Sequence, residues 1–134
     1  AQMHADMGFG PDRSEATARL GSLERAGAAF ALHSDFNLVV TPLSPLLVAE
    51  IAVTRIGADG ETVLAPGERI SVDRALRAIT IDAAHVLRRD DQLGSIEVGK
   101  LADFTVLADD PYQVAPTDLG SIEVVDTILG GIPT

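Results

Sequence analysis

The sequence predicts an α/β fold that ends in a small β-rich tail, and three observations support this prediction. Up to about Leu87, apolar residues recur at the spacing of helices. One apolar run, Ala28–Leu32, is typical of a buried strand and directly follows the first predicted helix. From Gly94 onward, apolar and polar residues alternate as they do in strands. We therefore expect two units, residues 1–93 and residues 94–134.

The first predicted helix covers residues 14–28. Its apolar residues, Leu20 and Leu23 among them, fall on one face, and Gly27 ends it. The strand Ala28–Leu32 follows at once, which gives the helix-then-strand order of an αβ unit.

Each of the next three predicted helices begins at a residue that suits the N-cap, where a side-chain oxygen accepts a hydrogen bond from a free backbone N–H. The N-cap residues are Ser44, Ser71 and Asp82, and the helices run through Val53, Ile79 and Leu87. Pro45 suits the first helical position after Ser44. Glycines and prolines between residues 57 and 67 predict a loop.

The tail is predicted to contain strands over residues 95–98, 102–107 and 122–129. Gly130 and Gly131 are a hairpin signal after the last of these strands. We expect the return strand of that hairpin to be missing from the chain, which would leave the sheet an open edge of the kind that proteins normally pair or cover.

The composition limits both the size and the partners of the fold. The chain has 134 residues, 46% of them hydrophobic, and a mean hydropathy of +0.22, which suffices for the core of one domain at most. Its net charge of −10 comes from 20 acidic and 10 basic residues with no basic patch, so we expect neither nucleic acid nor an anionic membrane as a partner. The absence of cysteine excludes disulfides and cysteine-ligated zinc.

The chain shows no signal-peptide pattern at its start, and no apolar stretch approaches the ~20 residues of a membrane span. We therefore expect a cytoplasmic protein. The chain starts without Met and ends soon after Gly131, so we also expect a piece of a longer polypeptide. A complete (β/α)₈ barrel needs roughly 250 residues, and a barrel strand in this chain would belong to a barrel that lies mostly elsewhere.

The main candidate for chemistry is Asp35, at the end of the apolar run that becomes His33-Ser34-Asp35. The carboxyl ends of strands are where α/β enzymes gather their functional groups. The alternative is that Ser34 and Asp35 are ordinary turn or N-cap residues. His33 lies two residues before Asp35 and would point to the same face of a strand, either bonded to the carboxylate or simply packed there.

Several phrases of the sequence resemble the metal-dependent amidohydrolase superfamily, in the branch of the N-substituted formamide deformylases and exoenzyme-regulator proteins. These phrases are Ser34-Asp35-Phe36, Ala52-Val53-Thr54-Arg55, Ala75–Ala84, Gly94–Pro111 and Val124–Gly131. The most specific is the Gly-Ser-x-Glu-x-Gly-Lys-x-Ala-Asp phrase that starts at Gly94. The resemblance covers nearly the whole chain, as the C-terminal portion of a longer enzyme.

This resemblance implies a TIM barrel with a small β-sandwich domain, of which the chain would supply the last barrel strand, the helices after it and the C-terminal sandwich strands. It also implies that Asp35, by motif position, binds a divalent metal, zinc in the intact enzyme, and takes the proton of the attacking water. A bound metal lowers the pKa of water toward about 7, which suits a carboxylate base. The family's other ligands, a His-x-His pair among them, are absent, so we expect no stable metal binding by this chain alone.

Three residues are candidates for substrate binding: His33, Asn37 and His4. Asn37 stands where the family usually has a proline, and because loops after barrel strands set substrate choice, this departure leaves the substrate open. His4 lies near the position of a Gln-Pro-x-His phrase of the family, with different prolines and spacing. Lys100 and Asp103 fit a turn and the start of a strand, and we assign them to structure.

We therefore expect the C-terminal part of an enzyme that hydrolyses an amide-like C–N bond in a small molecule. The competing hypothesis is a catalytically silent fragment that a partner chain completes. In both cases we expect self-association or a partner that supplies the rest of the barrel, because apolar surfaces would otherwise be exposed.

Overall fold

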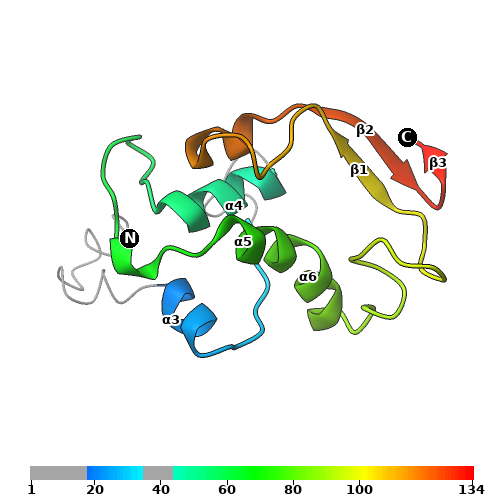
Figure 1. Cartoon of the computed structure of the whole chain (residues 1–134), viewed down its shortest axis with the longest axis horizontal. Helices are drawn as coiled ribbons and strands as arrows, with labels where there is room; N and C mark the ends of the chain where they lie inside the picture. The colour runs from blue at the N-terminus through cyan, green and yellow to red at the C-terminus, as the bar shows by residue number, and fades with distance from the viewer. Residues whose placement is uncertain (1–17, 35–43) are drawn as a thin grey trace.

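The computed structural model describes residues 18–34 and 44–134 (Figure 1). The predicted site residues His4, Asp35 and Asn37, and the first part of the predicted helix 14–28, lie outside these residues. The helices are α3 (Leu20–Arg25), α4 (Pro45–Thr54), α5 (Val72–Ile79) and α6 (Ile81–Val86), with 3₁₀ turns η2 (Pro66–Glu68) and η3 (Pro116–Ser121). The strands are β1 (Phe104–Leu107), β2 (Val124–Leu129) and β3 (Ile132–Pro133).

Two of the predicted N-caps are confirmed. The Ser44 hydroxyl accepts a hydrogen bond from the Leu47 N–H at 3.3 Å, and α4 starts at Pro45 as expected. The Ser71 hydroxyl accepts from the Arg74 N–H at 3.1 Å at the start of α5. Both caps satisfy backbone donors that a helix leaves free at its first turn.

The third predicted N-cap is wrong. Helix α6 is preceded by Thr80, whose backbone (φ −123°, ψ −97°) makes the break from α5, so that α6 already begins at Ile81. Asp82 therefore lies inside the first turn, where its carboxylate forms an ion pair with Arg74 instead of capping the helix.

The predicted strand Ala28–Leu32 is not paired in a sheet within the part of the chain that the structure describes. A strand needs a neighbour for its backbone groups, and here α5 takes that place. The Leu32 N–H donates to the Ala78 carbonyl at 3.0 Å, and the Arg74 guanidinium donates to the carbonyls of Ala28 and Phe30. The backbone of this segment is therefore bonded to α5 instead of to a neighbouring strand.

The tail forms a three-stranded antiparallel sheet in the order β1-β2-β3, in which Phe104 pairs with Ile128. The expectation that the return strand is missing is wrong, because β3 pairs with the end of β2 across the Gly130-Gly131 turn. Both glycines have positive φ (58° and 84°), the conformation such a tight hairpin needs. A return strand of two residues was too short for a hydrophobic pattern to reveal.

The predicted strand over residues 95–98 is also wrong, since none of these residues lies in a strand. The Ser95 hydroxyl bonds the Glu97 carboxylate and accepts a hydrogen bond from the Lys100 ammonium at 2.6 Å. Ile96 is 84% exposed, so the alternating pattern here does not mark a buried face. Local side-chain bonds compete with strand pairing in such segments.

Two apolar clusters form the core, and α4 contributes to both. One contains Ala49, Ala52, Ile70 and Ala75, with Phe30 and Leu32 packed against it. The other joins Leu46 of α4 to Leu119 and Ile122, which lie in and after η3. Figure 1 shows α4 between α5 and the η3 turn, with the sheet extending away from the helices.

The observed fold is thus a small mixed helix and strand unit, and the described residues do not form a complete barrel. The division between residues 93 and 94 stays a prediction. No helix in residues 18–34 or 44–134 has both the length and the apolar character to cross a membrane.

Candidate functional site

The candidate site lies at the end of the extended segment Ala28–Ser34, directly before Asp35. The side chains of Phe30 and Leu32 pack on the first core cluster, and the Leu32 backbone is bonded to α5. Because successive side chains of an extended chain point to opposite sides, burial of Phe30 and Leu32 turns the odd-numbered residues the other way. His33 is accordingly exposed.

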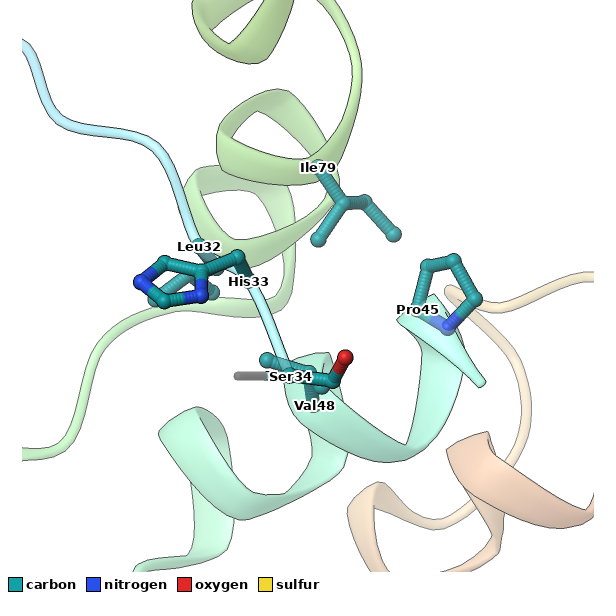
Figure 2. A pocket seen from close by; sticks show the side chains of 6 residues that line it. All are labelled: Leu32, His33, Ser34, Pro45, Val48 and Ile79. Carbon is teal, nitrogen blue, oxygen red and sulfur yellow. The ribbon is translucent and has the colours of Figure 1, made fainter. Parts of the chain in front are cut away.

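A pocket of about 210 Å³ opens where this segment meets the start of α4 and the end of α5 (Figure 2). It is lined by Leu32, His33, Ser34, Pro45, Val48 and Ile79. Four of these residues are apolar, and the two polar ones are His33 and Ser34. Apolar walls with a few polar groups are typical of small-molecule sites, and the volume here is below the ~300–1,000 Å³ of such pockets.

The two polar residues of the pocket lie differently. In Figure 2 the imidazole of His33 lies on the side of the segment away from Ile79 and Pro45, whereas Ser34 stands between the segment and Pro45. Both residues line the pocket, but the His33 imidazole points away from its apolar wall at Ile79 and Pro45 (Figure 2). The predicted interaction of His33 with Asp35 remains a prediction, because residue 35 lies outside the described residues.

Sequence reasoning missed Arg74 at this site. Its guanidinium donates to the carbonyls of Ala28 at 3.3 Å and Phe30 at 3.2 Å, and lies 3.9 Å from the centre of the Phe30 ring. The same group forms an ion pair with Asp82. A spacing of eight residues between Arg74 and Asp82, across the break at Thr80, hides this pair from a search for helical i, i+4 partners.

Three residues from two of the recognisable phrases, Arg55, Lys100 and Asp103, have structural roles. Arg55 ends α4 with a positive φ of 60°, and its Nε donates to the Leu64 carbonyl at 3.1 Å, across the loop that follows. Burial lowers the pKa of its guanidinium below its ordinary range, and the negative charge of Glu68 partly offsets this effect. Asp103 accepts a hydrogen bond from the Gly130 N–H at 2.7 Å and so anchors the hairpin turn. Lys100 bonds within its own turn, in agreement with the assignment of both residues to structure.

The described residues do not make a metal centre by themselves. Among residues 18–34 and 44–134, no three side chains of His, Cys, Asp or Glu gather closely enough to hold an ion. A stable site needs three or four protein ligands, so the donors present in this part of the chain do not fit a bound metal without further groups.

Comparison with known proteins identifies the class to which this α/β chain belongs, that of the amidohydrolases. The model of the amidohydrolase family matches residues 1–134, and the chain belongs to this family. It is 35% identical over 112 residues to an N-substituted formamide deformylase of Arthrobacter pascens, covering 83% of this chain and 20% of that protein. It is 33% identical over 109 residues to an imidazolonepropionase of Bacteroides thetaiotaomicron, covering 80% of this chain and 23% of that protein.

A third relative is the protein LONG AFTER FAR-RED 3 of Arabidopsis thaliana, 39% identical over 110 residues, which cover 82% of this chain and 18% of that protein. The chain thus spans about a fifth of the length of these curated relatives. The family resemblance inferred from the Gly94–Asp103 phrase and its companions is therefore confirmed.

Proposed function

We propose that the protein to which this chain belongs hydrolyses an amide-like C–N bond of a small molecule, with Asp35 taking the proton of the attacking water. Water adds to the carbon of that bond, and the nitrogen leaves as an amine. The observation that carries the proposal is the match of the amidohydrolase family to the whole chain. The names of two relatives, a formamide deformylase and an imidazolonepropionase, support a small C–N substrate.

The family is generally metal-dependent, and we propose that Asp35 is one ligand of a divalent ion, zinc by the donor chemistry of the family. The described residues offer no cluster that completes such a site, so the other ligands would come from elsewhere in the protein. Our proposal for the chain itself is limited to Asp35 as ligand and base, with His33, Asn37 and His4 near the substrate.

The pocket supports this placement of the substrate. Its apolar walls from Leu32, Val48 and Ile79 lie beside the residue that precedes Asp35. We propose a cytoplasmic enzyme, with neither nucleic acid nor membrane as a partner, in keeping with the net charge of −10.

A second candidate function is a catalytically silent unit completed by a partner chain. The exposed apolar residues of the sheet favour it, since Leu129 and Ile132 are 62% and 69% exposed. Such residues are typical of surfaces that another segment covers. The two candidates differ in whether Asp35 matters for chemistry.

The test uses the longer polypeptide that contains this chain, as wild type, as Asp35→Ala and as the control Asp59→Ala. Asp59 is exposed, and its carboxylate bonds only within its own loop, to Glu61 and Thr62, among the contacts of the described residues. Release of amine from an N-substituted formamide and opening of an imidazolone are followed, together with metal content by plasma mass spectrometry. We expect Asp35→Ala to lower the rate by about 10²- to 10⁴-fold and to lower the metal content, with the control unchanged. Equal rates in all three proteins would show that Asp35 is not the base.

A further inference from the structure

The loop between α4 and η2 folds back on itself over residues 55–64, and we call this segment the 55–64 hairpin. Its two arms are joined where the Gly57 N–H donates to the Thr62 carbonyl at 2.7 Å and where the Leu64 N–H donates to the Arg55 carbonyl at 2.9 Å. Arg55 is buried at the base, whereas residues 58–63 are exposed at the tip. Water therefore reaches the tip of the hairpin.

The tip contains the one Asp-Gly pair of the sequence, Asp59-Gly60. The Gly60 N–H donates to the Gly57 carbonyl at 3.0 Å and closes a turn, and Gly60 has a φ of +75°, which glycine adopts without strain. The turn thus favours glycine at this position. Because glycine has no side chain to shield its own nitrogen, the Asp59 side chain lies next to an unhindered peptide nitrogen.

An Asp-Gly pair can rearrange through a cyclic imide with water as the only other reactant. The Gly60 nitrogen attacks the side-chain carbonyl carbon of protonated Asp59. A C–N bond forms, a C–OH bond breaks, and the hydroxyl leaves with the amide proton as one water. A second water then opens the imide. Opening at the side-chain carbonyl restores aspartate, whereas opening at the main-chain carbonyl gives isoaspartate, in which the chain runs through the side-chain carboxyl.

Three hydrogen bonds hold the Asp59 carboxylate away from this reaction. Its Oδ1 accepts from the N–H of Glu61 at 3.1 Å and from that of Thr62 at 2.9 Å, and its Oδ2 accepts from the Thr62 hydroxyl. The ring closes only when the side-chain carbon turns toward the Gly60 nitrogen, which requires the oxygens to leave these donors. The Thr62 hydroxyl and the two N–H groups also lower the pKa of Asp59, so less of the reactive protonated acid is present at neutral pH.

We propose that Asp59-Gly60 is a site of isoaspartate formation in this chain, and that Thr62 keeps the rate of this reaction low in the folded protein. One exposed pair combines the two reactive residues with three hydrogen bonds that oppose their reaction. The inference is independent of the proposed function, because Asp59 has no part in the hydrolysis proposed above.

Isoaspartate would change the hairpin itself. The main chain would gain one methylene between residues 59 and 60, and a free carboxylate would remain on the Cα of residue 59. The longer chain would move the Gly60 N–H away from the Gly57 carbonyl that it now meets at 3.0 Å. The modification would therefore open the tip of the hairpin, while the bond between Arg55 and Leu64 keeps the base closed.

The test compares the wild type, Thr62→Val, Thr62→Ser and the control Thr117→Val in the longer polypeptide that contains this chain. The proteins are aged at neutral pH and physiological temperature, and isoaspartate at each aspartate is quantified by peptide mapping with mass-spectrometric fragmentation. The wild type unfolded in guanidinium chloride gives the unrestrained rate. Amide hydrogen exchange at Ala52, a buried residue of α4, reports whether each variant remains folded.

We expect isoaspartate at residue 59 of the folded wild type, at about a tenth of the unrestrained rate or less. Thr62→Val keeps the shape of the side chain but removes the hydroxyl, and it should raise the rate about tenfold, because a hydrogen bond to a charged group is lost. Thr62→Ser keeps a hydroxyl and should behave as the wild type does. Thr117→Val removes a hydroxyl that bonds Asp118, which leucine follows, and should leave the rate at residue 59 unchanged.

Three results would overturn the inference. Isoaspartate that forms in the unfolded protein at other aspartates but not at residue 59 would refute the assignment of the site. Equal rates in the wild type and Thr62→Val, or in the folded and the unfolded wild type, would refute the role of Thr62. Loss of protection at Ala52 in Thr62→Val together with the faster rate would reduce Thr62 to a contribution to general stability.

Discussion

Gly94, the first residue of the most specific family phrase, is required by space and by backbone conformation. Its φ is +86°, and a Cβ there would lie 2.7 Å from the Cβ of Ala84 and 2.7 Å from the Cα of Ile81. Only glycine takes such a conformation freely, and real atoms do not approach so closely. The glycine therefore lets the chain pass directly over the first turn of α6.

We predict that Gly94→Ala lowers the free energy of unfolding by about 2 kcal/mol, since overpacking and a strained φ act together. Gly67→Ala is the matched control, because a Cβ at Gly67 meets nothing within 4 Å. Urea unfolding of the purified chain measures both. A stability loss in the Gly67 variant equal to that of Gly94→Ala would contradict the explanation by space.

At the scale of elements, α3 and the η2 turn are joined by one carboxylate. Glu68 accepts hydrogen bonds from the hydroxyl of Ser22 at 2.6 Å and from its N–H at 2.7 Å. These bonds favour the charged form, so they lower the pKa of Glu68 below its ordinary 4.5, with a smaller contribution from Arg25. The stabilisation is therefore complete above the ordinary pKa and is lost as the pH falls through the lowered value.

We predict that Glu68→Gln is less stable than the wild type at neutral pH, and that the difference shrinks as the pH falls below 4.5. Glu61→Gln, in the exposed loop, is the control and should keep the same pH dependence as the wild type. Chemical unfolding as a function of pH measures the three proteins. A difference that stays constant down to acid pH would rule out titration of Glu68 as its cause.

The elements also show what the sequence could and could not predict. The N-caps Ser44 and Ser71 and the starts of α4 and α5 were predictable, because a cap acts within one turn. The strands β1 and β2 were predictable from alternation over several residues. The strand over residues 95–98 was wrong because Ser95 and Lys100 bond locally, and the role of Arg74 was hidden because its partners Ala28 and Phe30 lie more than forty positions away.

Part of the candidate site could likewise be predicted from the sequence, and part of it could not. Asp35 could be singled out because its phrase follows an apolar run, and the family match supports the class of chemistry but does not test the residue. The pocket could not be predicted, because Leu32, Val48 and Ile79 come from three separate segments. Only the packing of α4 and α5 against the segment brings them together.

At the scale of the whole molecule, the sheet has few pairing partners, and many of its apolar side chains are exposed. Strand β1 pairs only with β2 among the described residues, and β3 contributes two residues. The paired residues Leu129 and Ile132 share one face, together with Thr127, and this face is exposed. Small sheets of this kind need a covered face to be stable.

We therefore predict that the isolated chain self-associates at micromolar concentration through this exposed face. Light scattering of the purified chain should give a dimer or a larger species, and Leu129→Lys should shift it toward the monomer. Val86→Lys is the control, because Val86 is equally exposed at 63% but lies on α6, outside the sheet. A monomeric wild type, or equal dissociation by both substitutions, would show that the sheet does not drive association. Dissociation by Leu129→Lys alone would show that this face of the sheet drives the association.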